Sequence, residues 1–476
     1  MTTMTEAPIG QQIPQRVHLV GIGGIHMSAI AHILLTWGHT VSGSDLRPSP
    51  LTERLAAEGA SVFEGHHAEN VGEAALVVTT SAARGDNPEI GEARRRSLPV
   101  IKRAEMVAWL MQGRYAVAVA GSHGKTTTSA LIAFILKRAG FSPTYLIGGE
   151  VADLGGNAAA GSGRHIVVEA DEFDAAFLSY HPQLAVVTNV EPDHLDIYGS
   201  LERLAEAFAR FLGQVPPDGR IIGCADNAVV RRLLGLEGSP PSAPRVARYV
   251  ESYALDRPAL WTAESLEPQP DGSYSFRALR QGQAHGSFHT GVPGRHNVSN
   301  SLAAIAAAHA LDVPLETVRE AVAAFRGVRR RFELVGEAGG VTVMDDYAHH
   351  PTEVRATLAT ARQRFGGRRL VCLFQPHTYS RTRYLLEGFR TCFEGADELL
   401  IADTYAARET PEAGMDGRQL ADAIEQPRAR FVATFEEAAE TACALLRHGD
   451  VFFTIGAGDV DQVGPMVLER LRSKKA

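Results

Sequence analysis

The residues with the clearest capacity for chemistry are the run Gly121-Ser122-His123-Gly124-Lys125-Thr126-Thr127-Thr128. It lies between an apolar strand pattern at 116–120 and a helical pattern at 127–139. Small residues let backbone N–H groups surround phosphate oxygens, and the start of a helix adds the positive end of its dipole. Lys125 suits the β- and γ-phosphates of a nucleotide, and Thr126 suits Mg²⁺. Val119 stands where the strict phosphate-loop pattern has glycine, so an ordinary tight turn between strand and helix is the alternative. The run of residues 121–128 nevertheless favours nucleotide binding.

Acidic residues follow the next two apolar strand patterns, at 166–168 and 184–188. The first group is Glu169-Ala-Asp-Glu172 and the second is Asp193-His194-Leu-Asp196. Hard oxygen ligands suit Mg²⁺, and a histidine beside them suits a second ion or the substrate. Each acid alone is more typical of a helix cap or a solvated loop. Two acidic groups at the ends of strands, downstream of a phosphate-type loop, favour a functional site.

A first glycine-rich turn, Gly21-Ile22-Gly23-Gly24, follows a strand pattern at 16–20 and resembles a dinucleotide fingerprint. Asp45, about 20 residues onward, suits a ribose. His26 occupies the place of the third glycine, where close packing of helix on strand disfavours a side chain. The turn therefore predicts a pyrophosphate at a helix N-terminus without nicotinamide, and an NAD-dependent dehydrogenase is a disfavoured alternative.

Further polar clusters lie in the C-terminal half. Asn297 and Asn300 precede an alanine-rich helical pattern at 301–311 and suit a base edge, although Ser299 alone would explain a helix cap. The run Arg329-Arg330-Arg331 suits phosphates or is a solvated turn. Residues 345–351 and 374–383 each follow a buried strand pattern and are dense in polar groups, which favours a site.

These motifs sit on strands that alternate with helices, which predicts parallel sheets built from right-handed βαβ units. The fold class is therefore α/β with three domains: 1–112 and 327–476 Rossmann-like, and 113–326 a phosphate-loop-type domain with a parallel sheet. The alternating pattern at 261–291 predicts β-hairpins, the small β portion of the central domain. Proline-rich residues 238–244 predict a loop.

The composition suits a folded cytoplasmic protein. Apolar residues are 45% and charged residues 21% of the chain, which excludes a disordered or fibrous protein. With 47 basic and 55 acidic residues, the net charge of −8 argues against nucleic acid as the main partner. No apolar run reaches the roughly 18 residues of a membrane helix, so we expect no membrane insertion. The four cysteines are widely spaced, as is typical of a reducing compartment.

Taken together, the motifs resemble those of the Mur ligase family. The resemblance covers residues 21 to about 458 and rests on eight motifs in family order: 21–24 with 27–28, 121–128, 169–172, 193–196, 296–300, 330–332, 345–351 and 374–377. It implies ATP-dependent ligation of L-alanine to the lactyl carboxylate of UDP-N-acetylmuramate through an acyl phosphate, in peptidoglycan synthesis. Later family members carry a lysine shortly after the His194 motif. Residues 195–214 contain none, which favours the alanine-adding member.

The resemblance also implies residue roles. Lys125, Glu169, His194, Arg331, Asp346 and His349 are expected to be catalytic, with Thr126, Glu169 and His194 as Mg²⁺ ligands. ATP is expected to contact Gly121, Ser122, His123, Gly124, Lys125, Thr126, Thr127, Asn297, Asn300, Arg331 and Asp345. The other substrates are expected to contact Gly21, Gly23, Gly24, Asp45, His66, Ser81, Tyr347, His377 and Arg381, the first six of them in a UDP-sugar cleft.

Two alternatives remain besides the disfavoured dehydrogenase. A ligase that recycles murein tripeptide shares most of the pattern, and a nucleotide-sensing protein without catalysis would share the fold. The intact set of Lys125, Glu169 and His194 argues against the second of these. The protein is expected to be a monomer or a homodimer, and its third domain to close about Gly327 during the reaction.

Overall fold

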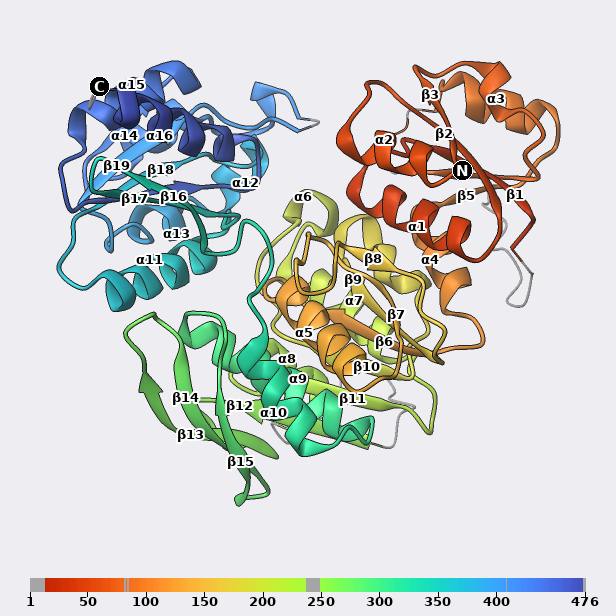
Figure 1. The fold of residues 1–476 in the computed structure, drawn as a ribbon, viewed down its shortest axis with the longest axis horizontal. Coiled ribbons are helices and arrows are strands. Elements are labelled where there is room, and N and C mark those ends of the chain that lie inside the picture. The colour runs from red at the N-terminus through yellow and green to blue at the C-terminus, as the bar shows by residue number, and fades with distance from the viewer. Residues whose placement is uncertain (1–12, 81–82, 84, 237–248, 408, 474–476) are drawn as a thin grey trace. The chain divides into compact units, whose positions relative to one another are not determined.

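The computed structural model describes residues 13–80, 83, 85–236, 249–407 and 409–473 (Figure 1). Three sheets packed with helices make this a three-domain α/β protein, as the sequence predicts. The described residues group into two compact units: one within 1–190, 205–260 and 303–321, the other within 191–204, 261–302 and 322–476. Within the described ranges, no helix is both long and apolar enough to span a bilayer.

The first sheet of the first unit is wholly parallel, in the order β3-β2-β1-β4-β5. Its central strand β1 buries four of its five residues, as a strand covered on both faces must. Helix α1 begins at Ile25, directly after the glycine turn. The elements are β1 (Arg16–Val20), α1 (Ile25–Thr36), β2 (Thr40–Asp45), α2 (Pro50–Ala57), β3 (Ser61–Glu64), η1 (Ala68–Val71), β4 (Leu76–Thr79), α3 (Pro88–Arg95), β5 (Val100–Lys102) and α4 (Arg103–Met111).

The second sheet of this unit runs β12-β11-β10-β6-β9-β7-β8, with only β8 antiparallel to its neighbour among these strands. Helix α5 begins at Lys125, two residues before the predicted start, so the lysine opens the helix. The loop predicted at 238–244 lies outside the described residues. The elements are β6 (Tyr115–Ala120), α5 (Lys125–Arg138), β7 (Thr144–Leu146), β8 (Ala158–Ala159), β9 (His165–Ala170), η2 (Phe173–Ser179), β10 (Leu184–Val187), β11 (Arg220–Cys224), α8 (Ala228–Leu234) and β12 (Tyr249–Ala254).

The second unit contains the predicted hairpins and a six-stranded sheet. The hairpin strands β13, β14 and β15 are antiparallel. The six-stranded sheet has the order β16-β17-β21-β18-β19-β20, parallel except for edge strand β16. Its elements and the hairpins are α6 (Leu195–Tyr198), β13 (Trp261–Pro268), β14 (Tyr274–Arg280), β15 (Gln283–His289), β16 (Glu333–Ala338), β17 (Val341–Asp346), α11 (Pro351–Phe365), β18 (Leu370–Phe374), α12 (Tyr379–Tyr384), α13 (Leu386–Thr391), β19 (Glu398–Ala402), η3 (Pro411–Ala413), α14 (Gly417–Ala423), β20 (Ala429–Val432), α15 (Phe435–Leu445), β21 (Val451–Ile455), η4 (Val460–Gln462) and α16 (Val463–Ser473). Helices α7 (Leu201–Leu212), α9 (Arg295–Ala310) and α10 (Leu315–Ala324) have residues in both units.

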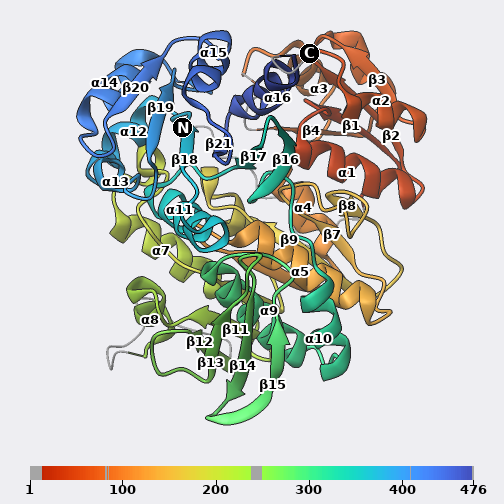
Figure 2. The same ribbon diagram turned by 60° about the vertical axis from the view of Figure 1, so that its left-hand side comes forward.

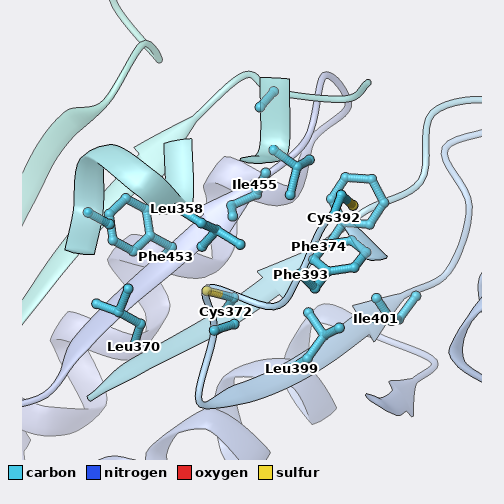
Figure 3. Close-up of a cluster of buried hydrophobic side chains, with 14 of the residues drawn as sticks. Leu358, Leu370, Cys372, Phe374, Cys392, Phe393, Leu399, Ile401, Phe453 and Ile455 are labelled. Carbon is cyan, nitrogen blue, oxygen red and sulfur yellow. The ribbon is translucent and has the colours of Figure 1, made fainter. Parts of the chain in front are cut away.

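Successive strand residues of the six-stranded sheet feed two separate cores. Cys372 and Phe374 of β18 pack against Leu358 of α11 and Phe393 (Figure 3), whereas Leu373 points to the opposite core formed with α15 and α16. Figures 1 and 2 show α11 and α13 on one side of this sheet and α15 and α16 on the other. With both faces covered by helices, the carboxyl ends of the parallel strands are open to a ligand, and candidate site residues lie there.

Candidate active site

The loop between β6 and α5 is a rigid cradle for an anion. Gly121 and Gly124 have φ of +139° and +79°, a region that favours glycine, and a Cβ on Gly121 would overlap the Thr188 hydroxyl. His123 N–H donates to Asn189 Oδ1 (2.8 Å), and the Thr188 hydroxyl donates to His123 O (2.5 Å). The two residues directly after β10 thus fix the loop, and the N–H groups at the start of α5 follow it directly.

Lys125 is a buried cation held by a buried carboxylate. Its Nζ lies 2.9 Å from Glu172 Oε2 and 2.5 Å from Gly121 O, and Glu172 has no exposed side-chain surface. Burial alone would lower the pKa of Lys125, but the carboxylates of Glu172, Asp171 and Glu169 outweigh it and raise that pKa above its usual value. The lysine is therefore charged, as the prediction for phosphate binding requires.

Thr126 and Glu169 offer oxygen donors beside this lysine. The Thr126 hydroxyl donates to Glu169 Oε1 (3.1 Å), and Gly148 N–H donates to Glu169 Oε2 (2.9 Å). Burial raises the pKa of Glu169, and the Lys125 charge opposes that rise. A hydroxyl and a carboxylate of this kind fit Mg²⁺, which prefers hard oxygen ligands. His194, the third expected ligand, belongs to the second unit.

The glycine turn after β1 is fixed by the end of β2. Gly21 N–H and Ile22 N–H donate to Ser44 O (2.8 and 3.0 Å), and Gly23 N–H donates to Asp45 Oδ2 (2.9 Å). His66 joins the same edge, because its Nδ1 lies 2.9 Å from Ser44 Oγ. Gly24 ends the turn as the residue before α1. The structure thus brings Gly21, Gly23, Gly24, Asp45 and His66 together, whereas Ser81 lies outside the described residues.

In the second unit, Arg381 joins two of the predicted site segments. Its Nε donates to Asp193 Oδ1 (2.9 Å), and its guanidinium donates to His377 Nδ1 (2.7 Å). The ring of His349 lies 5.8 Å from that of His377. His194 N–H also donates to Asp193 Oδ1 (2.8 Å). The structure therefore brings His194, His349, His377 and Arg381 together around one carboxylate, Asp193.

The histidines of this cluster have lower pKa values than is usual for histidines near carboxylates. Burial lowers the pKa of His349 to about 4 and that of His377 to about 3. Burial would raise the pKa of Asp193, but Arg381 and the neighbouring imidazoles hold it well below its usual range. His349 Nδ1 lies 3.0 Å from Tyr347 O, so the neutral ring keeps its proton on Nδ1 and offers Nε2 as an acceptor.

The arginine and aspartate residues around Tyr347 hold the loop after β17. Arg330 and Arg331 each lie 5.1 Å from the Tyr347 ring. Asp345 accepts from Thr454 (2.5 Å) and Arg330 (3.0 Å), whereas Asp346 accepts from the N–H groups of residues 332 and 348. Burial raises the pKa of Asp346 to about 6. Both aspartates are the last residues of β17, whereas the sequence reading placed them after the strand.

Asn297 and Asn300 lie inside α9, so the prediction that they precede the helix is wrong. The helix begins at Arg295, six residues before the predicted start, because Gly294 (φ +97°) accepts from Asn297 N–H and turns the chain into it. The Ser299 cap is therefore wrong too. Asn300 Nδ2 donates to Asn297 Oδ1 (2.9 Å), and Asn297 donates to Pro293 O (2.6 Å).

Three residues at these sites were not selected as site residues from the sequence. Glu172 and Asp193 belong to the motifs at 169–172 and 193–196. The sequence could have identified them, because each is a carboxylate close to a residue predicted as a metal ligand. Glu353 accepts from His349 N–H (3.0 Å) and lies 3.5 Å from Arg331. It closes the capping box at the start of α11, so its signal in the sequence was a glutamate two residues after Pro351 at the first helical position.

Comparisons with known proteins agree along the chain. Three family models match: the Mur ligase family catalytic domain over residues 16–115, the Mur ligase middle domain over 119–308 and the Mur ligase glutamate ligase domain over 330–458. UDP-N-acetylmuramate–L-alanine ligase of Myxococcus xanthus (strain DK1622) is 48% identical over 462 residues, 96% of this chain and 95% of its own length. The protein of the same name from Geobacter sulfurreducens is 43% identical over 465 residues, 97% and 98% of the two chains.

Solved structures show the same relationship. The crystal structure of UDP-N-acetylmuramate–alanine ligase from Thermotoga maritima matches with a TM-score of 0.79 at 30% identity, over 96% of this chain and 99% of that one. A murein peptide ligase from Psychrobacter arcticus matches with a TM-score of 0.70 at 25% identity, over 96% and 99%. From residue 16 to residue 458, the chain belongs to the Mur ligase family.

Proposed function

We propose that this protein joins L-alanine to UDP-N-acetylmuramate, with conversion of ATP to ADP and phosphate, as a cytoplasmic enzyme of peptidoglycan precursor synthesis. The observation that carries the proposal is the fixed loop around a charged Lys125, in a chain 48% identical over its length to a ligase of that name. A carboxylate is a poor electrophile, and phosphorylation turns one of its oxygens into a leaving group. ATP supplies that phosphoryl group.

In the first step, the lactyl carboxylate oxygen attacks the γ-phosphorus and ADP leaves. Such a transfer needs alignment and charge neutralisation more than covalent help. The N–H groups at the start of α5 and the Lys125 ammonium would bind the phosphates. Lys125 would exchange its bond to Glu172 for a phosphate oxygen. Thr126 and Glu169, with His194, would hold Mg²⁺, which neutralises charge on the phosphate oxygens when bound.

In the second step, the alanine amino group attacks the acyl phosphate carbonyl and phosphate leaves. Arg381 would bind the alanine carboxylate, since a guanidinium matches a carboxylate in geometry. His349, neutral and with Nε2 as an acceptor, is suited to take the proton of the attacking amine. His377 and Tyr347 would complete this subsite.

Other assignments follow the three domains. Residues 1–112 would bind the UDP-sugar, 113–326 ATP and 327–476 the amino acid. Asn297 and Asn300 would contact the adenine, and Arg331, Asp345 and Asp346 would act on ATP from the third domain. The protein would be a monomer or a homodimer.

The test is phosphate release with ATP, Mg²⁺ and UDP-N-acetylmuramate, measured for L-alanine, glycine, L-serine and murein tripeptide separately. We expect L-alanine to give the highest kcat/KM, with UDP-N-acetylmuramoyl-L-alanine as the product. The Lys125→Met variant should lose at least about a thousandfold in kcat. Lys137→Met, on the same helix near its end, should not change it. Stimulation by tripeptide and not by alanine would replace the proposal with the recycling activity.

A further inference from the structure

A buried carboxylate lies beneath the glycine turn of the first sheet. Glu89, in the first turn of α3, has no exposed side-chain surface. Its Oε2 accepts from the Ser44 hydroxyl (2.6 Å) and lies 3.2 Å from His66 Nδ1. Its Oε1 accepts from Asn70 Nδ2 (2.7 Å) and lies 3.6 Å from His18 Nε2. Four side chains, from β1, β2 and the stretch after β3, thus surround one carboxylate.

Glu89 is charged in spite of its burial. Burial would raise its pKa, but the nearby imidazole of His18 and the hydrogen bonds from Ser44 and Asn70 outweigh that effect and hold the pKa at about 2. A buried charge of this kind is costly unless every lone pair has a partner. An ionised carboxylate accepts hydrogen bonds and cannot donate them.

This charge decides which nitrogen of His66 carries the proton. The Ser44 hydroxyl donates its only proton to Glu89, so Ser44 Oγ can only accept from His66 Nδ1, 2.9 Å away. The second neighbour of Nδ1, Glu89 Oε2, also only accepts. His66 Nδ1 must therefore hold the proton. In the neutral ring, Nε2 is then an acceptor, and none of the described residues bonds to it.

The same serine ties His66 to the glycine turn. Ser44 O accepts from Gly21 N–H and Ile22 N–H, while its hydroxyl bridges Glu89 and His66. The imidazole and the turn are thus fixed to one residue at the end of β2. His66 keeps part of its side chain exposed, at 21%, so Nε2 has a route to a ligand.

We propose that Glu89 is a positioning residue for the nucleotide part of the substrate: it holds His66 with Nδ1–H directed inward and Nε2 presented as an acceptor to a ribose hydroxyl or to the uracil N–H. The inference rests on the proposed function, in which this domain binds the UDP-sugar. Glu89 itself touches no substrate and acts only through Ser44 and His66. It extends the predicted cleft by a residue that no sequence motif marks.

The test is the isosteric variant Glu89→Gln. A glutamine amide bonded to Asn70 through its oxygen turns an N–H toward Ser44 and His66. The Ser44 hydroxyl would then accept from the amide and donate to His66 Nδ1, which places the His66 proton on Nε2. We expect the KM for UDP-N-acetylmuramate to rise about tenfold or more, a typical loss for one hydrogen bond near charge. The kcat and the KM values for ATP and alanine should stay within about twofold. Glu92→Gln is the matched control and should change nothing: Glu92 lies one turn along α3, and its carboxylate accepts from Arg95 on the helix surface.

Two further measurements separate positioning from folding. Long-range ¹H–¹⁵N spectra, with His66 assigned by loss of its signals in His66→Gln, should show Nδ1–H in the unaltered protein and Nε2–H in Glu89→Gln. If Glu89→Gln does not fold, Ser44→Ala keeps the acid and removes the bridge, and it should raise the same KM severalfold. Nε2–H in the unaltered protein, or an unchanged KM in a folded variant, would overturn the inference.

Calorimetry with UDP alone distinguishes the two proposals. If the unaltered protein makes no alanine ligation product, but Glu89→Gln binds UDP more weakly than it does, the positioning role is supported and the proposed function is refuted. A protein that ligates alanine but binds UDP equally well in both forms does the reverse.

Discussion

Replacing Gly148 by alanine tests the Mg²⁺ assignment without touching a ligand. A Cβ on Gly148 would lie 2.6 Å from Glu169 Oε2 and 3.1 Å from its carboxyl carbon, where ordinary contact begins near 3.4 Å. Gly148 does not have a positive φ, so alanine strains no backbone there. The carboxylate must withdraw by about 0.8 Å, the difference between those distances. The bonds from Gly148 N–H and the Thr126 hydroxyl would lengthen with it.

The expected losses follow from that displacement. A shift of roughly 1 Å in a catalytic group costs up to about a hundredfold in rate, and disturbing the outer partner of a metal ligand costs about 10–100-fold. We therefore expect the Mg²⁺ concentration for half-maximal activity to rise about 10–100-fold. The weakened hydrogen bond to a buried carboxylate should destabilise the first unit by about 1–3 kcal/mol.

The assay is initial phosphate release as a function of Mg²⁺ at saturating ATP, alanine and UDP-sugar, with thermal unfolding recorded beside it. Gly91→Ala is the control, because a Cβ there meets nothing within 4 Å. That residue lies in α3, so alanine should leave the Mg²⁺ curve unchanged and stabilise the helix slightly. If the curve of folded Gly148→Ala coincides with that of the unaltered protein, Glu169 does not hold the metal.

Two further predictions concern the cluster of the second unit. Asp193→Asn removes the carboxylate from a buried ion pair, so we expect the unfolding free energy to fall by about 3–5 kcal/mol. The KM for alanine should rise, because Arg381 loses its fixed position. Thermal unfolding and alanine titration would measure the two effects, and an unchanged melting temperature would count against the ion pair. His349 and His377, with pKa values of about 4 and 3, should give flat NMR titrations from pH 8 to 5.5. In the unfolded chain these rings bind protons near pH 6.5, so stability should fall on acidification from pH 7 toward 4, by up to about 1.4 kcal/mol per pH unit for each ring. A midpoint above pH 6 for either ring would contradict the burial argument.

The turn from β6 into α5 could be predicted because its sequence signals are local. Gly121, Gly124 and Lys125 meet the requirements of a tight turn into a helix, and the strand and helix patterns lie within a few residues. The same holds for the parallel strands, whose continuous apolar runs mark buried positions. The helix starts were less predictable, because Asn297 sits in α9 only through the turn at Gly294.

Contacts between distant segments could not be predicted in this way. Asp193 and Arg381 are 188 residues apart, and no periodicity links them. The first glycine turn shows the same limit. At this turn the close contact between segments requires glycine at Gly43 of β2, because a Cβ there would lie 2.8 Å from Ile22 Cβ. Gly24, in the turn itself, has room for a Cβ. His26, which breaks the fingerprint, is accommodated in neutral form, since burial lowers its pKa to about 4.

A common arrangement explains how a chain of net charge −8 can serve anionic substrates. Lys125 is bonded to Glu172, Arg381 to Asp193, and Arg331 lies 3.5 Å from Glu353. Each cation assigned to a phosphate or a carboxylate thus lies beside a carboxylate of the protein, which favours its charged form.

A substrate anion must then share the cation with the protein carboxylate or replace that carboxylate. The affinity for the substrate therefore depends on the exchange of one anion for another and not on attraction to an unpaired cation. Such exchange favours anions that bring extra bonds, as a triphosphate does at the loop of residues 121–127, over simple salts. Simple anions such as sulfate should therefore inhibit weakly, although the substrates are anionic themselves.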